Sequence, residues 1–187
     1  NTLFKYTPLQ SSFAINNVAL VGGRPRTMSL KDIIRVFVDF RHDVIVRRTR
    51  FELEKARKRA HILEGLIKAI DVIDRIIEIV RSSRSVDEAK GRLIEEFGFS
   101  DLQATAIVEM KIRQLTGLER EKLQAEYDEL AKFIAYCEDV LASTEKQMEI
   151  IKNETMELKA KYGDRRRSEI VPNADEFNPE DFYADDD

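Results

Sequence analysis

Hydrophobic residues recur alternately four and three positions apart through the second half of the chain. This stripe consists of Leu123, Tyr127, Leu130, Ile134, Cys137, Leu141, Thr144, Met148, Ile151, Thr155, Leu158 and Tyr162. A second stripe with the same spacing consists of Val46, Thr49, Leu53, Ala56, Ala60, Leu63, Ile67 and Ile70. The spacing is that of a coiled coil, and neither helix can bury such a face alone. We therefore expect the two helices to pack against each other.

The two stripes are separated by about fifty residues with helical patterns of their own. The pattern predicts a mainly α fold, in which a long antiparallel coiled-coil hairpin carries a small helical head at its tip. The predicted segments are ascending arm helices over 30–70, a head over 71–116 and descending arm helices over 117–162. The descending helices would span roughly 60 Å at 1.5 Å per residue.

Capping signals predict where the helices begin. A hydroxyl residue stands three positions before an acidic or amide side chain at Ser29, Ser85, Ser100, Thr116 and Thr144, so each can cap a helix. With a glycine stop at Gly98, these signals predict head helices over 86–97 and 101–115.

Two interruptions are expected in the arm. The stripe loses its phase near Asp71 and resumes at Ile73, Ile77 and Val80, which predicts a bend. At Ser143 a capping signal competes with an uninterrupted stripe, and we expect a short break that keeps the register. Both positions are candidate hinges.

The two ends of the chain differ from its helical middle. Residues 1–29 alternate apolar and polar positions around Gly22 and Gly23, which predicts a short N-terminal β-hairpin. Because two strands are marginal alone, we expect the hairpin to belong to a larger sheet. Residues 163–187 carry nine acidic residues against three arginines, which indicates an acidic linker.

The charge of the chain is unevenly distributed. The formal net charge is -4, yet residues 41–59 hold eight Lys or Arg and only three acids. Arg47, Arg48 and Arg50 are candidates for contacts with DNA phosphates. The alternative is a solvated helix flank that pairs with Glu52 and Glu54.

The sequence offers little for catalysis. His42 and His61 have no acid or cysteine at ligand spacing, so no metal site is predicted, and no phosphate-binding loop appears. The single cysteine, Cys137, lies on the stripe and is expected to be a buried apolar residue. We predict no catalytic, cofactor-binding or metal-binding residue in this chain.

No apolar run approaches the length of a membrane span and no signal peptide is evident, so we expect a cytoplasmic protein. The missing initiator methionine suggests a piece of a longer polypeptide.

The head is richer in apolar residues than one covered face requires. Ile107, Val108, Met110, Ile112 and Leu115 follow one another closely. Either they fill an ordinary small core or some of them pack between subunits.

Four strings of the sequence resemble the A subunit of bacterial DNA gyrase. They lie at Val46–Ala56, Arg59–Leu66, Gln114–Lys122 and Tyr162–Ile170, in family order and across nearly the whole chain. The A subunit of topoisomerase IV shares the arm and is the alternative, although the string Thr116–Glu119 favours gyrase.

The resemblance implies a type IIA topoisomerase, which cuts one DNA duplex, passes another through and reseals the cut. Residues 1–29 would end the tower domain, and two heads would meet as the exit gate of a homodimer that works with gyrase B subunits as A2B2. Mg and ATP would belong to the gyrase B partner. Tyr6 superficially echoes the family's nucleophile, but it precedes a string resembling the tower, so no catalytic residue is carried over. The candidate dimer contacts are Ile107, Met110, Arg113, Gln114, Leu115 and Thr116.

Two functions of other classes remain open at this point. A structural coiled-coil spacer would explain the stripes but not the apolar head. A sequence-specific DNA-binding module would need a recognition helix or an aromatic platform, and neither accompanies the basic segment.

Overall fold

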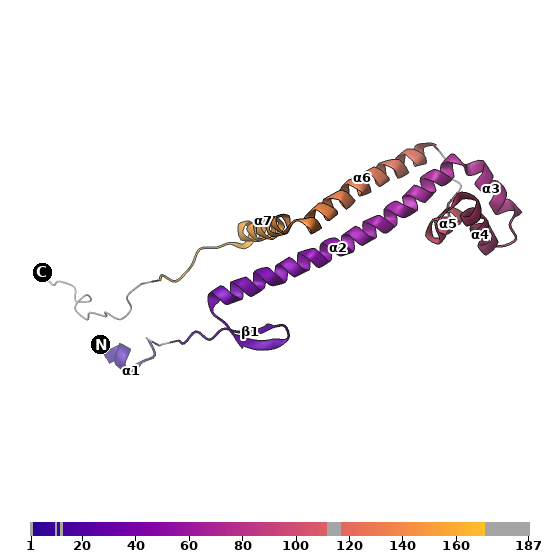
Figure 1. Ribbon diagram of the computed structural model, residues 1–187. Helices are drawn as coiled ribbons and strands as arrows, with labels where there is room; N and C mark the ends of the chain where they lie inside the picture. The colour runs from indigo at the N-terminus through magenta and orange to yellow at the C-terminus, as the bar shows by residue number, and fades with distance from the viewer. Residues whose placement is uncertain (1, 10, 12, 112–116, 171–187) are drawn as a thin grey trace. The chain divides into compact units, whose positions relative to one another are not determined.

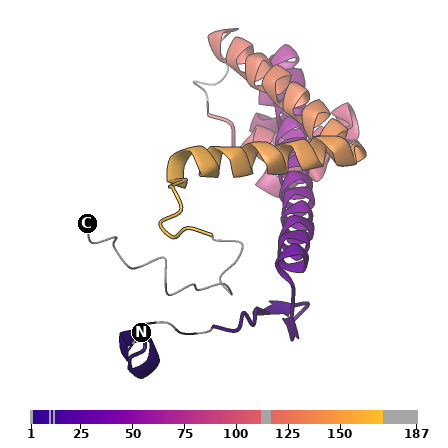
Figure 2. The same cartoon turned by 90° about the vertical axis from the view of Figure 1, so that its left-hand side faces the viewer.

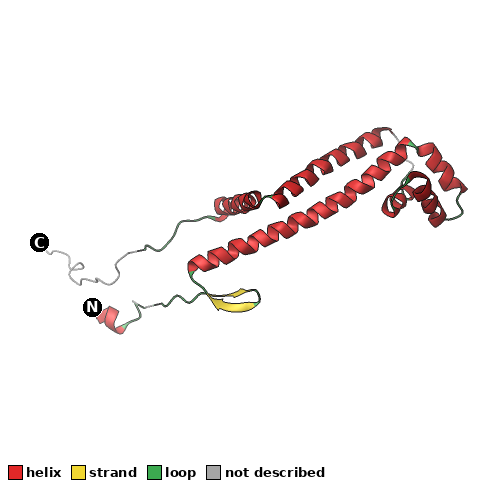
Figure 3. Ribbon diagram, in the orientation of Figure 1, coloured by secondary structure: helices red, strands yellow, loops and turns green. Residues whose placement is uncertain are grey.

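The computed structural model describes residues 2–9, 11, 13–111 and 117–170. The chain divides into two compact units, residues 1–39 with 153–187, and residues 40–152. Helices dominate the described residues, whose strands form one two-stranded sheet (Figure 3). The predicted mainly α fold with a short β-hairpin is therefore confirmed.

The β-hairpin lies in the first unit. Strand β1 (Val18–Val21) pairs antiparallel with β2 (Arg24–Thr27). Gly22 and Gly23 both have positive φ, 58° and 77°, as a two-residue turn of this hand requires. Phe13 and Ile15 precede β1 and are exposed, so the strand is shorter than the alternation indicated. A short helix, α1 (Thr2–Tyr6), was not predicted.

The longest helix is α2 (Leu30–Asp71), which begins in the first unit and continues into the second. Its start is capped as predicted: the Asp32 backbone N–H donates to Ser29 Oγ at 3.2 Å. The Ser29 hydroxyl also donates to the Asp32 carboxylate, and these bonds hold the pKa of Asp32 below its ordinary value.

In the second unit, α2 is paired with α6 (Gly117–Ala142), which runs in the opposite direction (Figure 1). Three ion pairs join the two helices: Arg57–Glu138 (2.5 Å), Arg59–Glu126 (2.7 Å) and Asp71–Arg120 (2.9 Å). As the position on α2 moves toward its C-terminal end, the partner on α6 moves toward the N-terminal end of that helix. The antiparallel hairpin predicted from the stripes is confirmed, and we call this pair the arm.

The buried face of the arm is the predicted one over most of its length. On α2 the buried residues include Thr49, Leu53, Ala56, Ala60 and Leu63, all on the upstream stripe. On α6 Cys137 is fully buried, as its stripe position predicted. Spacing alone therefore identified the contact between the two helices.

The arm is interrupted at Ser143, as predicted, and the predicted register is kept only in part. Helix α7 (Thr144–Tyr162) follows α6 with a change of direction that Figure 2 shows. The Lys146 N–H donates to Ser143 Oγ at 3.3 Å, so Ser143 is the cap and Thr144 is the first helical residue. Of the stripe positions just beyond the break, Thr144 and Met148 are exposed, whereas Ile151 is buried, with 6% of its surface exposed. Gln147, which is not on the stripe, is also buried. The stripe is therefore displaced around the break and regained at Ile151.

The head consists of α3 (Ile73–Ser82), α4 (Val86–Phe97), α5 (Asp101–Val108) and the end of α2. The bend at Asp71 is confirmed, since α2 ends there and α3 begins two residues later. Ser85 and Ser100 cap α4 and α5 through their side chains, and Gly98 ends α4 with φ of 69°, all as predicted. The core of the head is formed by Ala69, Ile76, Ile79, Leu93, Phe99, Ala104 and Ile107.

Helix α5 is shorter than the predicted span over 101–115. It ends at Val108, and the Met110 N–H bonds to the Ile107 carbonyl three residues back, at 3.2 Å, as in a tightened final turn. The β-branched pair Ile107 and Val108 favours helix only weakly. Residues 112–116 lie outside the described residues.

Candidate functional site

The head carries an apolar groove, which we call the head groove. It encloses about 400 Å³ and is lined by Ile73, Ile76, Ile77, Val80, Arg81, Ile107, Val108 and Met110. Its walls are α3 and the end of α5, and among the described residues of the lining only Arg81 is charged. An open apolar surface of this kind on a small helical head is typical of a contact with another molecule.

Helix α3 forms this groove because it has two apolar faces. Ile76 and Ile79 point into the core of the head and are 3% and 0% exposed. Ile73, Ile77 and Val80 are spaced four and three residues apart on the neighbouring face, and Ile77 and Val80 are 36% and 39% exposed. One face therefore holds the head together, while the other is only partly covered by the chain itself.

Two of the six predicted dimer contacts line the head groove. Ile107 is buried, with 3% of its surface exposed, and contributes its side chain mainly to the head core. Met110 is half-buried and follows the end of α5. Arg113, Gln114, Leu115 and Thr116 lie outside the described residues. Ile77 and Val80 were not proposed as contacts from the sequence, although their spacing was noticed.

The head is fixed to α2 by a polar cluster around Gln103. Gln103 is 7% exposed, and its Nε2 donates to the His61 carbonyl at 2.7 Å. Its Oε1 accepts from the Ser100 N–H at 3.0 Å, which completes the capping box of α5. His61 Nε2 lies 2.7 Å from Ser100 Oγ. These contacts give His61 a structural role at the junction of arm and head.

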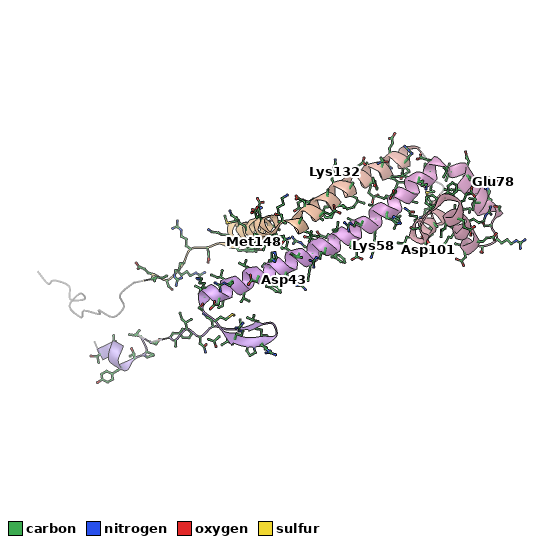
Figure 4. All side chains as sticks on the ribbon, viewed as in Figure 1. Asp43, Lys58, Glu78, Asp101, Lys132 and Met148 are labelled. Atoms are coloured by element: carbon green, nitrogen blue, oxygen red, sulfur yellow. The ribbon has the colours of Figure 1, made fainter. Side chains whose placement is uncertain are left out.

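Surface ion pairs support the head from outside. Arg75 on α3 bonds to Glu96 on α4, with Nε 2.6 Å from Oε1, and also to Glu78. The hydrogen bond from Arg75 holds the pKa of Glu96 below its ordinary value. Glu78, the second partner of Arg75, also lies on α3 and is labelled in Figure 4.

The basic segment of α2 faces several directions. Arg47, Arg48 and Arg50 are all exposed, and Arg47 Nε donates to the Asp43 carbonyl at 3.4 Å. At 3.6 residues per turn, Arg48 and Arg50 lie about 160° apart around the helix. The three arginines therefore do not form one surface patch.

Further along α2, much of the positive charge is paired. Lys58 pairs with Glu54 at 2.6 Å, which lowers the pKa of Glu54. Arg57 and Arg59 pair with Glu138 and Glu126 on α6, and the Glu126 bond raises the pKa of Arg59. Of the pairing expected with Glu52 and Glu54, the structure shows the Lys58–Glu54 pair, while Arg57 and Arg59 pair with α6 instead. Arg41, Arg48 and Lys55, seven residues apart, share one side of α2, and we call them the basic flank.

Within the described part of the chain, no three His, Cys, Asp or Glu side chains gather so as to hold a metal ion. No described helix is both long enough and apolar enough to cross a membrane.

Comparison with known proteins gives one consistent result. Residues 1–156 match the family of the DNA gyrase and topoisomerase IV A subunits. The DNA gyrase A subunit of Treponema pallidum is 48% identical over 183 residues, which cover 97% of this chain and 22% of the relative. The DNA gyrase A subunit of Mycolicibacterium smegmatis is 48% identical over 187 residues, with 98% and 22% covered.

A third relative, the DNA gyrase A subunit of Deinococcus deserti, is 44% identical over 184 residues, with 98% of this chain and 23% of the relative covered. The chain thus spans less than a quarter of the length of these curated relatives.

Proposed function

Because the chain belongs to the family of DNA gyrase and topoisomerase IV A subunits, we propose that it forms the arm and exit gate of a gyrase A subunit. The parent enzyme would be a type IIA topoisomerase that supercoils DNA in an ATP-dependent reaction in the cytoplasm. Its Mg and ATP sites would lie in the gyrase B partner of an A2B2 assembly. In this proposal the chain itself supplies no catalytic residue.

The observation that carries the proposal is the head groove at the end of an antiparallel arm. Ile77 and Val80 expose apolar surface that a second head could cover, and a symmetric pair of heads would bury the same patch on both protomers. Met110, which lines the groove, would lie in the same interface. The predicted contacts Arg113, Gln114, Leu115 and Thr116 lie outside the described residues and stay predictions.

The arm has dimensions suited to a gate. The part of α2 from Phe40 to Asp71 rises about 45 Å at 1.5 Å per residue, so a small rotation at its base would move the head by a large distance. A structural spacer would need the arm but would have no use for the half-exposed face of α3. Gyrase is favoured over topoisomerase IV because the cited relatives, 44–48% identical, are named as gyrase proteins.

The gate is tested in the full-length protein, assembled with its B-type partner, by changing Ile77→Asp. We expect ATP-dependent supercoiling to be lost, because a charge in the head groove prevents the heads from closing. Val86→Asp is the matched control: Val86 is exposed at the first turn of α4 and does not line the groove. Full supercoiling by the Ile77 variant would overturn the proposal.

We further propose that the basic flank lies toward the transported duplex. Lys and Arg bind phosphates with the release of counterions, so each lost contact lowers the salt dependence of DNA binding. In the full-length protein, Arg48→Glu with Lys55→Glu should reduce the slope of the logarithm of DNA affinity against the logarithm of salt concentration by about 1 per residue. Arg47→Glu should reduce this slope by a similar amount if Arg47 contacts DNA. Arg50→Glu, on the other side of α2, reports whether that side also meets DNA. Unchanged slopes in all of these variants would remove DNA contact from this segment.

A further inference from the structure

The break between α6 and α7 is held by the side chain of one buried residue. Gln147, on α7, is 5% exposed. Its Nε2 donates to the Val140 carbonyl at 2.8 Å and to the Leu141 carbonyl at 3.3 Å, both in the last turn of α6. Its Oε1 lies 2.6 Å from His42 Nε2 on α2. We call these three contacts the latch.

The latch replaces two particular backbone hydrogen bonds. In an uninterrupted helix, the Val140 and Leu141 carbonyls would accept from the N–H groups of the residues four positions later, Thr144 and Glu145. At a helix end such carbonyls need another partner. The Gln147 amide is such a partner for both carbonyls, and the Val140 carbonyl also accepts from the Ser143 N–H at 3.4 Å.

The residue types around Ser143 do not by themselves require the helix to be interrupted. Residues 139–147 contain neither glycine nor proline, the residues that usually end or kink a helix. Ala142, Glu145, Lys146 and Gln147 are good helix formers. The interruption therefore depends on side-chain contacts: the latch, the Ser143 cap and an ion pair between Lys146 and Asp139.

The sequence also encodes the uninterrupted alternative. Counted from Cys137 at 100° per residue, Met148 would lie about 20° away on a continuous helix, whereas Gln147 would lie about 80° away. The apolar stripe thus runs through the break, yet Met148 (labelled in Figure 4) is 41% exposed and Gln147 is buried. Ile151, the next stripe residue, would lie about 40° from Cys137 on a continuous helix and is 6% exposed in the observed arrangement, so the conflict is confined to Met148 and Gln147.

From this conflict we propose that Ser143 is the centre of a two-state hinge. In one state, the observed one, the latch holds α6 and α7 as two helices. In the other, residues 117–162 form one continuous helix in which Met148 takes the buried stripe position and Gln147 moves to its edge. The proposal rests on the contacts of residues 40–152 and does not require the function proposed above.

The hinge is tested by measuring a distance across the break. Spin labels are attached at Lys132→Cys on α6 and Lys152→Cys on α7, two exposed positions, in a Cys137→Ala background. A continuous helix separates these positions by about 30 Å along its axis at 1.5 Å per residue. The bent arrangement gives a shorter distance in the unmodified sequence.

We expect Gln147→Leu to release the hinge, so that double electron–electron resonance shows a new population near about 30 Å with unchanged helical circular dichroism. Gln124→Leu, an exposed glutamine of α6, is the matched control and should keep the short distance. Thr144→Pro added to Gln147→Leu should restore the short distance, because proline is tolerated at the first position of α7 but not inside a continuous helix.

Two results would overturn the proposal. One is a Gln147→Leu variant with the same distance distribution as the parent sequence. The other is a loss of helical signal without the longer distance, since the bent arm would then be the only folded state.

Discussion

Gly65 of α2 lies directly against Gln103 of α5. A Cβ atom on Gly65 would come within 2.6 Å of Gln103 Cγ and 2.8 Å of its Cβ, distances that side chains do not adopt. The glycine therefore allows the head to approach the arm closely enough for Gln103 to reach the His61 carbonyl.

This close approach predicts the effect of a methyl group. Gly65→Ala should lower the free energy of unfolding by about 1–3 kcal/mol, since the buried Gln103 must move and lose its hydrogen bonds. Gly91→Ala is the control within α4, where an added Cβ meets nothing within 4 Å. Alanine should raise stability there by about 0.5–1 kcal/mol. Urea denaturation measures both, and equal effects would refute the proposed close contact.

The bond between Arg75 and Glu96 predicts sensitivity to acid. The pKa of Glu96 is held below its ordinary value of 4.5 in the folded chain. Its carboxylate therefore stabilises the fold above pH 4.5, and this contribution is lost as the pH falls through the lowered pKa. We expect Glu96→Gln to reduce the loss of stability between about pH 7 and about pH 3, measured by urea denaturation at each pH.

Glu95→Gln, at the adjacent exposed position, is the control for this experiment. It changes a neighbouring carboxylate and leaves the Arg75–Glu96 pair intact, so its effect on the pH dependence should be smaller than that of Glu96→Gln. If Glu96→Gln changed nothing while Glu95→Gln flattened the profile, the ion pair would not be the cause of the acid sensitivity.

Cys137 should be almost unreactive in the folded chain. Its side chain is fully buried between α2 and α6, and burial raises the pKa of its thiol. Modification by a thiol reagent then requires local opening of the arm, so it should be slower by on the order of 100-fold or more than for an exposed cysteine. Tyr136→Cys in a Cys137→Ala background provides that exposed reference, since Tyr136 is 54% exposed. Comparable rates at the two positions would mean that the arm is not closed around Cys137.

The sequence was most informative where local signals and packing agree. Ser85 and Gly98 delimit α4 through capping chemistry that depends on only a few neighbouring residues. The stripe from Thr49 to Leu63 identified the buried face of α2 because each residue meets the same partner helix. Periodicity and caps are sufficient in such places.

Other features depend on contacts between residues far apart in the chain. The burial of Gln147 beyond the break at Ser143 involves a contact with His42, more than a hundred residues away. The head groove requires α5 to lie beside α3, so the stripe of Ile77 and Val80 could be noticed but not assigned to a surface. The early end of α5 at Val108 likewise had no strong stop signal in the sequence.

The most direct test of the gate is the mass of this chain in solution. Light scattering should give twice the 21.7 kDa of one chain for the parent sequence, because two heads cover each other's groove. Val80→Asp, on the half-exposed face of α3, should give 21.7 kDa with unchanged helical circular dichroism, while Val86→Asp should remain dimeric. A parent chain that is monomeric at every concentration, or a Val80→Asp variant that dimerises as well as Val86→Asp, would contradict the exit-gate proposal.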